Sequence, residues 1–284
     1  NNELPSLVLV KSDGATTYFL RDLATIKYRL KNWQADLIVY EVGVDQALYF
    51  RQLFKTLELL GWLKKNEKFV HVVHGLMRSQ TGKFSTRKGE TVHLEDVLKE
   101  AIERAKDIIK KSQTQRGLSE EKTQELAKAV GIGAIKYNDL CQHHAKDIIF
   151  DWNKLLNLKG NSGPYLQYTY ARCQSVMRKS AISLDILAKK AIKYDASADE
   201  LLILRLFCRF PETVKQAADS FSPNIICNFV FTVAKEYNSF YNFHSILKAK
   251  TEEQQVFRLM LTFAAGQLIK NSLLILGIEC PEKM

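Results

Sequence analysis

The sequence predicts an α/β domain with a parallel sheet, followed by an all-α helical bundle. Apolar strand-like runs alternate with helical patterns over the first hundred residues, and the pattern is helical from Leu94 to Leu276. A run rich in glycine and proline, residues 157–164, separates the two parts. We therefore expect an α/β domain with its connecting helices at residues 1–156 and a helical domain at residues 157–284.

Three apolar runs are the expected strands of the first part, at residues 6–10, 36–42 and 69–74. Two helical patterns connect them, at residues 19–33 and 46–60, and Gly61 ends the second pattern. Wholly apolar strands that alternate with helices indicate parallel strands covered by helices.

Two charged amphipathic helices are expected at residues 94–111 and 120–140, joined by a polar segment. Gly131 and Gly133 lie inside the second helix without a strand before them, so they indicate close helix packing rather than a dinucleotide site. We expect the helices of the second half to be interrupted at Pro211, at Pro223 and at residues 248–253.

The composition is that of a soluble globular protein, with 46% hydrophobic and 25% charged residues. Lysine and arginine total 41 against 31 acidic residues, a net charge of +10, which suits a polyanionic partner but also an ordinary basic protein. The five cysteines are scattered, which argues against a disulfide framework and against structural zinc. With no signal-like or membrane-spanning pattern, we expect a cytoplasmic chain without membrane contact.

The segment from Ser79 to Gly89 carries three cations, four hydroxyls and two glycines directly after an apolar strand. These groups suit a polyphosphate, although a solvated hairpin tip would have the same composition. The segment is not a P-loop, because Gly75 lies too far upstream and Phe84 stands where that motif needs serine or threonine. The residues alone leave both interpretations open.

Tyr18 and Asp22 lie four residues apart at a helix start and therefore share one face. By themselves they indicate a packed aromatic ring and a first-turn carboxylate that complements the helix dipole. His71 and His74 lie in a strand pattern, where their spacing directs the two rings to opposite faces, so we predict no metal site there.

The helical half mixes aromatic with cationic side chains. Rings for base stacking among cations for phosphates are what single-stranded RNA requires, but aromatics at helical spacing are also typical of a hydrophobic core. The aromatic residues are Tyr165, Tyr168, Tyr170, Tyr237, Phe240 and Tyr241, and the cations are Arg172, Arg178, Lys179 and Lys235.

Four segments, in this order, resemble the arginyl-tRNA synthetases, a family of class I aminoacyl-tRNA synthetases. They are residues 12–22, the Lys83-Phe-Ser-Thr-Arg-Lys-Gly89 loop in the place of the KMSKS signature, residues 160–168 and the ending at residues 276–284. The matches span nearly the whole chain. The resemblance implies a partial Rossmann-type parallel sheet followed by a helical anticodon-binding bundle. It also implies a ligase that joins arginine to arginine tRNA at the expense of ATP.

The resemblance assigns catalysis to Lys83, Ser85 and Arg87. In this family the arginine carboxylate attacks the ATP α-phosphate in line, and cations stabilise the charge that grows on the phosphates, with Mg²⁺ bound to them. Thr86 stands where many class I enzymes have a lysine, which leaves open which cation replaces it. The residues implied to bind ATP are Leu76, Met77, Lys83, Phe84, Ser85 and Lys88.

The resemblance also implies two binding sites outside the loop. Tyr18, Asp22 and Gln46 match residues that hold the arginine substrate, whose guanidinium group requires a planar carboxylate partner. The residues that match positions at the anticodon are Tyr165, Tyr241 and Met284.

Nothing in the chain matches the HIGH-type sequence that opens the catalytic domain of this family. We therefore expect the front half of that domain to lie outside this chain, and the chain alone to be an inactive monomer. A stand-alone tRNA-binding protein derived from a synthetase is the alternative, and a helical scaffold with a vestigial α/β part is a third. The retained Tyr18, Asp22 and cationic loop favour the ligase.

Overall fold

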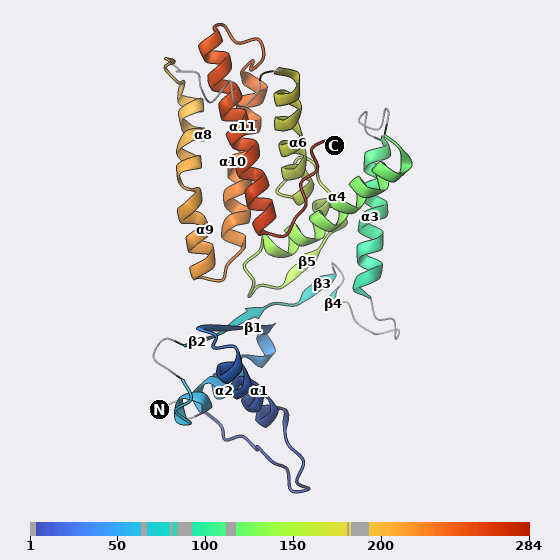
Figure 1. The fold of residues 1–284 in the computed structure, drawn as a ribbon. Coiled ribbons are helices and arrows are strands. Elements are labelled where there is room, and N and C mark those ends of the chain that lie inside the picture. Colours follow the sequence, from blue (N-terminus) through green and yellow to red (C-terminus); the bar gives the residue numbers. More distant parts are fainter. Residues whose placement is uncertain are drawn as a thin grey trace. The chain divides into compact units, whose positions relative to one another are not determined.

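The computed structural model divides the chain into two compact units (Figure 1). Unit 1 comprises residues 1–76 and 144–147, and unit 2 comprises residues 77–143 and 148–284. The structure describes residues 4–63, 67–79, 82–83, 93–111, 118–180, 182 and 193–284. In the described residues, no helix is both long and apolar enough to cross a membrane.

Unit 1 is built on two parallel strands, β1 (Leu37–Gly43) and β2 (Lys68–His74). Two helices pack with them, α1 (Tyr18–Asn32) and α2 (Ala47–Leu59), and a 3₁₀ turn, η1 (Val44–Gln46), leads from β1 into α2. The core residues are Phe19, Leu23, Ile26, Phe50, Leu53 and Leu57, with Tyr40, Val42 and Phe69 packed against them. The predicted parallel arrangement of strands and helices is confirmed at these elements.

Local signals set the ends of both helices. Thr17 is the N-cap of α1, and its side chain accepts a hydrogen bond from the backbone N–H of Leu20. After α2, Gly61 adopts a φ of 63°, the left-handed conformation that commonly ends a helix. Both boundaries lie within about two residues of those predicted.

The prediction of a strand at residues 6–10 is wrong. Only an isolated bridge between Val10 and Thr16 forms there, and Leu7, Val8 and Leu9 remain 39%, 63% and 41% exposed. The chain turns back at Gly14, and Thr17 is bound to the carbonyl oxygens of the segment through its hydroxyl. An apolar run becomes a strand only when a neighbouring strand pairs with it, and this run has no such neighbour among the described residues.

Residues 144–147 return to unit 1 beside the end of β2. The N–H of Gly75 donates to the carbonyl oxygen of His144 at 2.8 Å, and the N–H of Leu76 donates to Asp147 Oδ1 at 2.8 Å. A Cβ at Gly75 would lie 2.3 Å from the carbonyl oxygen of Lys146, so the close approach of the two segments requires glycine.

Unit 2 begins with a small sheet of three strands in the order β4-β3-β5. Strand β3 (Met77–Ser79) pairs antiparallel with β4 (Gly82–Lys83) and parallel with β5 (Ile148–Phe150). The expectation of a helical pattern throughout residues 94–276 is therefore wrong at β5. Three consecutive apolar residues are too few to distinguish a strand from a helix by periodicity.

Helices α3 (Leu94–Lys111) and α4 (Glu120–Leu140) have the predicted bounds and pack against each other. A Cβ at Gly131 would lie 2.7 Å from the carbonyl oxygen of Ala101, and one at Gly133 would lie 2.7 Å from Gln167 Nε2. Both glycines thus allow close helix packing, as predicted.

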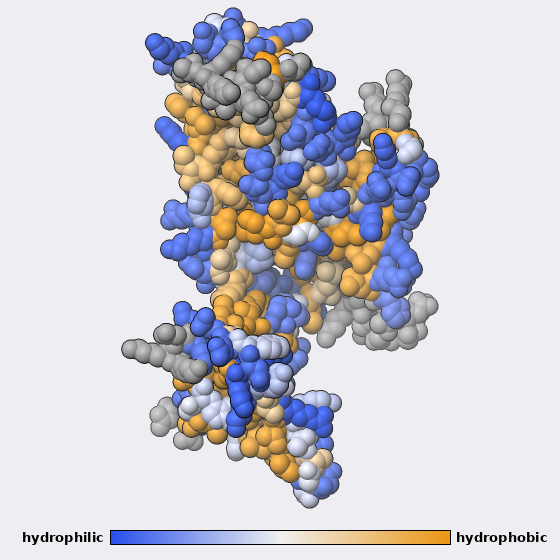
Figure 2. Space-filling view, viewed as in Figure 1, coloured by the Kyte–Doolittle hydropathy of each residue, from blue (hydrophilic) through white to orange (hydrophobic). Residues whose placement is uncertain are grey.

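The remaining helices form the bundle of unit 2. They are α5 (Trp152–Leu155), α6 (Gly163–Ser180), α8 (Ala198–Cys208), α9 (Phe210–Asp219), α10 (Asn224–Phe243) and α11 (Glu252–Ile275). The predicted interruptions at Pro211 and at Pro223 are confirmed, since one helix ends and another begins at each. The interruption predicted at residues 248–253 is confirmed in part, because α10 ends earlier, at Phe243, and α11 begins at Glu252. One side of α8 stays apolar at the surface (Figure 2), where Leu201 and Leu202 are 40% and 43% exposed.

Candidate functional site

Tyr18 and Asp22 lie on the first two turns of α1, four residues apart as predicted. Tyr18 is 81% exposed, and the guanidinium carbon of Arg21 lies 5.6 Å from the centroid of its ring. Asp22 is half-buried and, within the described part of the chain, has no ion-pair partner. Its carboxylate is therefore a partly desolvated anion that can receive a cation.

Tyr49, on the first turn of α2, donates a hydrogen bond from its hydroxyl to Asp22 Oδ2. Burial raises the pKa of Tyr49 well above its usual value, and the hydrogen bond and negative charge of Asp22 raise it further. The hydroxyl therefore remains a proton donor at neutral pH. Sequence reasoning missed Tyr49; its place three residues after Gln46 is the one local signal that could have found it.

Gln46 precedes α2 at the carboxyl end of β1, where the sequence placed it. Its backbone is the N-cap of α2 and its side chain is exposed. Tyr49 joins the first turn of α2 to Asp22 of α1 by a hydrogen bond. The start of α1 and the start of α2, which carry the predicted arginine ligands, therefore belong to one packed cluster.

Tyr40 belongs to the same cluster but has another partner. Arg29 Nη1 lies 3.4 Å from the Tyr40 hydroxyl, and the Tyr40 ring packs 5.0 Å from that of Phe50. Burial raises the pKa of Tyr40, and the nearby Arg29 partly opposes this rise. Arg29 is thus engaged with Tyr40 rather than paired with Asp22.

The residues predicted to bind ATP are only partly described. Leu76 ends unit 1, where its N–H is bound by Asp147, and Met77 opens β3 in unit 2. The backbone of Lys83 lies in β4 opposite Arg78, so the cationic segment begins as an antiparallel pair. The side chain of Lys83 and the whole of Phe84, Ser85, Arg87 and Lys88 lie outside the described residues.

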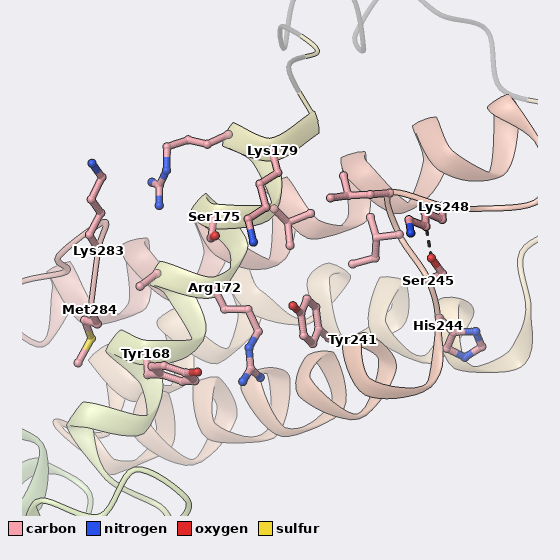
Figure 3. Close-up of a pocket in the computed structure, with 15 residues that line it drawn as sticks. Tyr168, Arg172, Ser175, Lys179, Tyr241, His244, Ser245, Lys248, Lys283 and Met284 are labelled. Carbon is pink, nitrogen blue, oxygen red and sulfur yellow. Dashed lines mark hydrogen bonds between the residues drawn. The ribbon is translucent and has the colours of Figure 1, made fainter. Parts of the chain in front are cut away.

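A groove of about 620 Å³ lies in unit 2 between α6, α10 and the C-terminus (Figure 3). Its floor is aromatic and its rim is cationic, a combination that suits single-stranded nucleic acid. The lining residues include Tyr168, Arg172, Ser175, Arg178, Lys179, Tyr241, His244, Ser245, Lys248, Lys283 and Met284.

Arg172 lies between two tyrosine rings of the groove (Figure 3). Its guanidinium carbon is 4.9 Å from the ring centroid of Tyr168 and 4.8 Å from that of Tyr241. Its Nη1 also donates to Oδ1 of the buried Asn238. The cation thus holds both rings in place while each remains 37% exposed.

The structure separates the three residues predicted at the anticodon. Tyr241 and Met284 line the groove, whereas Tyr165 is half-buried and does not. The hydroxyl of Tyr165 accepts a hydrogen bond from Asn238 Nδ2 at 2.9 Å, and its ring packs 5.7 Å from that of Phe231. Tyr165 is therefore connected to Arg172 through Asn238, one residue behind the groove.

The other aromatics of the helical half differ in burial. Tyr170, Tyr237 and Phe240 are 1%, 0% and 2% exposed, which confirms the core interpretation for these three. Tyr168 lies four residues before Arg172 and lines the groove, yet the sequence alone did not distinguish it from its buried neighbours.

The C-terminal segment is fastened along the bundle. Lys136 Nζ donates to the carbonyl oxygen of Gly277 at 2.6 Å, and the buried Gln167 donates to that of Glu279 at 2.7 Å. Met284 packs against the cluster formed by α3 and α4 and also lines the groove. The tail thus has a defined position at the edge of the groove.

Comparison with known families divides the chain in the same order. The model of tRNA synthetases class I (R), catalytic domain, matches residues 1–152. The model of the DALR anticodon binding domain matches residues 166–284. Together they account for most of the chain.

Curated relatives match nearly the whole chain. Arginine–tRNA ligase of Clostridium perfringens is 40% identical over 283 residues, 99% of this chain and 49% of the relative. The ligase of the same name from Chloroflexus aggregans is 37% identical over 284 residues, 100% of this chain and 49% of the relative. The chain spans about half the length of the curated relatives it matches.

Solved structures share the fold. Arginyl-tRNA synthetase from Plasmodium falciparum superposes with a TM-score of 0.84 and 27% identity, covering 97% of this chain and 46% of that one. The arginyl-tRNA synthetase of Thermus thermophilus gives a TM-score of 0.85 at 24% identity, covering 98% of this chain and 51% of that one, and supports the fold alone.

Proposed function

We propose, because this chain belongs to the arginyl-tRNA synthetase family, that it supplies part of an enzyme that activates arginine with ATP and then transfers it to tRNA. In the first step the arginine carboxylate attacks the α-phosphate, so that arginyl-adenylate forms and pyrophosphate leaves. In the second step a hydroxyl at the 3′ end of arginine tRNA displaces AMP. We propose a monomeric cytoplasmic enzyme.

The observation that carries this proposal is the hydrogen bond between Asp22 and Tyr49. It brings the first turn of α2, which follows Gln46, against the part of α1 that holds Tyr18 and Asp22. A guanidinium group requires a planar carboxylate and additional acceptors around it. Asp22, Gln46 and the Tyr18 hydroxyl offer groups of this kind.

ATP activation is proposed for the segment that includes Lys83, Ser85 and Arg87. Cationic and hydroxyl groups stabilise the charge that develops on the phosphates during in-line displacement, and contacts that strengthen in the transition state raise the rate. Leu76, Met77, Phe84 and Lys88 complete the proposed ATP contacts. Mg²⁺ enters with the substrate, because it binds phosphate oxygens and keeps several of its waters.

Recognition of arginine tRNA is proposed for the groove of unit 2. Tyr168 and Tyr241 present partly exposed rings on which bases can stack, and the cations of the rim can contact phosphates. Met284 closes one edge of the groove. Tyr165 supports this surface through Asn238 and Arg172 rather than by lining it.

An ATP–pyrophosphate exchange assay on the intact enzyme that contains this chain tests the activity. All twenty amino acids are screened in the presence of tRNA, and we expect exchange with arginine alone. Activation of a different amino acid would refute the proposal. The 284-residue chain is assayed in parallel, and we expect it to show no exchange because it spans only part of the enzyme.

A further inference from the structure

We propose that Tyr49 is a positioning residue, which holds the Asp22 carboxylate in the orientation that receives the guanidinium group of arginine. The inference rests on the proposed function, in which Asp22 pairs with the substrate. It adds a residue of α2 that the sequence did not single out and that acts through another side chain.

The ring of Tyr49 is held on two sides by buried aromatics. It meets Phe19 at a centroid distance of 5.5 Å and an interplanar angle of 85°, and Phe50 at 5.4 Å and 82°. Phe19 and Phe50 are only 3% and 4% exposed. Edge-to-face contacts with these two buried rings restrict the ring of Tyr49 and so favour one position of its hydroxyl oxygen.

That hydroxyl donates to one oxygen of the carboxylate, Asp22 Oδ2. A carboxylate offers about four acceptor positions, so one such bond leaves enough capacity for the two parallel N–H groups of a guanidinium. Asp22 is half-buried, and within the described residues no cation is paired with it. Tyr49 therefore orients the anion without neutralising it.

The same hydrogen bond joins the two helices that carry the predicted arginine ligands. Tyr49 lies three residues after Gln46, and Asp22 lies four residues after Tyr18. Fixing Tyr49 to Asp22 thus also sets the first turn of α2 relative to α1. A site assembled before the substrate arrives loses less conformational freedom on binding.

Two other roles for Tyr49 lead to different results. If its hydroxyl merely occupies the place of the guanidinium until arginine displaces it, removing the hydroxyl should tighten arginine binding. If Tyr49 only packs, removing the hydroxyl should affect both substrates equally or neither.

The test is Tyr49→Phe in the intact enzyme, which removes one oxygen and keeps the ring between Phe19 and Phe50. We expect the KM for arginine to rise about tenfold in pyrophosphate exchange, while the KM for ATP changes by less than about twofold. The matched control is Tyr40→Phe, which removes a hydroxyl bound to Arg29 in the same cluster. We expect the control to leave the KM for arginine within about twofold of that of the unmodified enzyme.

A double-mutant cycle with Asp22→Asn separates positioning from packing. In the Asp22→Asn background, Tyr49→Phe should have almost no further effect on the KM for arginine, because the residue it positions has already been changed. Effects of the two changes that simply multiply would overturn the inference, as would an unchanged or lowered KM in Tyr49→Phe alone. Should Asp22→Asn itself leave the KM for arginine unchanged, the proposed arginine site fails, and the inference fails with it.

Discussion

Replacing Tyr241 with alanine removes a stacking surface from the groove and leaves its cations in place. The ring is 37% exposed and lies 4.8 Å from the guanidinium carbon of Arg172. If one base of the anticodon loop stacks on it, the affinity of this chain for arginine tRNA should fall by about 1–3 kcal/mol, or roughly 5- to 150-fold.

The cost to folding is smaller than the loss of a fully buried aromatic. Truncating a core aromatic costs about 3–5 kcal/mol, and Tyr241 is already about one-third exposed to solvent. Including the contact with Arg172, which is worth about 0.5–1 kcal/mol at such a site, we expect a total loss of roughly 2.5–4 kcal/mol. At about 2–4 °C per kcal/mol, the melting temperature falls but the variant stays folded at 25 °C.

Fluorescence anisotropy with labelled tRNA at several salt concentrations measures the effect. Tyr241→Phe keeps the ring and should bind as tightly as the unmodified chain. Lys248→Ala, on the rim of the groove, should reduce the slope of log affinity against log salt by about one, which Tyr241→Ala should leave unchanged.

Base stacking on Tyr241 is refuted if Tyr241→Ala lowers the melting temperature but leaves the affinity for tRNA unchanged. Equal losses for tRNA with and without an arginine anticodon would also refute it, because they would leave only a basic surface without base recognition.

Three further predictions concern the loop, the tail and the bundle. In the intact enzyme, Lys83→Ala and Arg87→Ala should each slow adenylate formation with little change in the KM for arginine, and unchanged single-turnover rates in both would remove the loop from catalysis. Deleting Met284 should weaken the binding of arginine tRNA to this chain, measured by anisotropy, and change its melting temperature by no more than about 2 °C, measured by calorimetry. An unchanged affinity would show that the C-terminal residue does not take part in tRNA binding. Arg258→Met should lower the free energy of unfolding by about 3–5 kcal/mol, measured in urea, because it leaves the buried Glu200 carboxylate without its cation. Glu200 is 0% exposed, and Arg258 Nε lies 2.7 Å from its Oε1. A loss below about 1 kcal/mol would contradict a stabilising role for this ion pair. Burial alone would raise the pKa of Glu200, but hydrogen bonds from the helix start and from the Arg258 guanidinium lower it below 4.5. The ionised Glu200 therefore contributes to the stability of the folded chain above that pH, and this contribution is lost as the pH falls through the lowered pKa.

Local patterns were sufficient for most of the elements. An apolar stripe at helical spacing is the part of a helix that becomes buried, so α3 and α4 could be delimited before any partner was known. The largely apolar runs of β1 and β2, which alternate with helical patterns, indicated parallel strands. Proline, glycine and capping residues then set where helices begin and end.

Pairing between distant segments could not be predicted in this way. Residues 6–10 have the composition of a strand but pair with no strand in the described chain, whereas the short β5 is a strand because β3 lies beside it. Strand formation depends on backbone hydrogen bonds to another segment, and no local pattern records which segment that is.

The sequence by itself identified candidate ligands for arginine and tRNA, because Asp22, Gln46 and Tyr241 match binding positions of the family that the chain resembles. Only the tertiary structure decided how they are held. Asp22 and its partner Tyr49 are 27 residues apart in the sequence. Arg172 and its hydrogen-bond partner Asn238 are 66 residues apart. Polar groups find their partners by the packing of whole helices, because a buried donor or acceptor must be satisfied by whatever group the fold brings next to it. For that reason Tyr165, one turn from Tyr168 on the same helix, lies behind the groove while Tyr168 lines it.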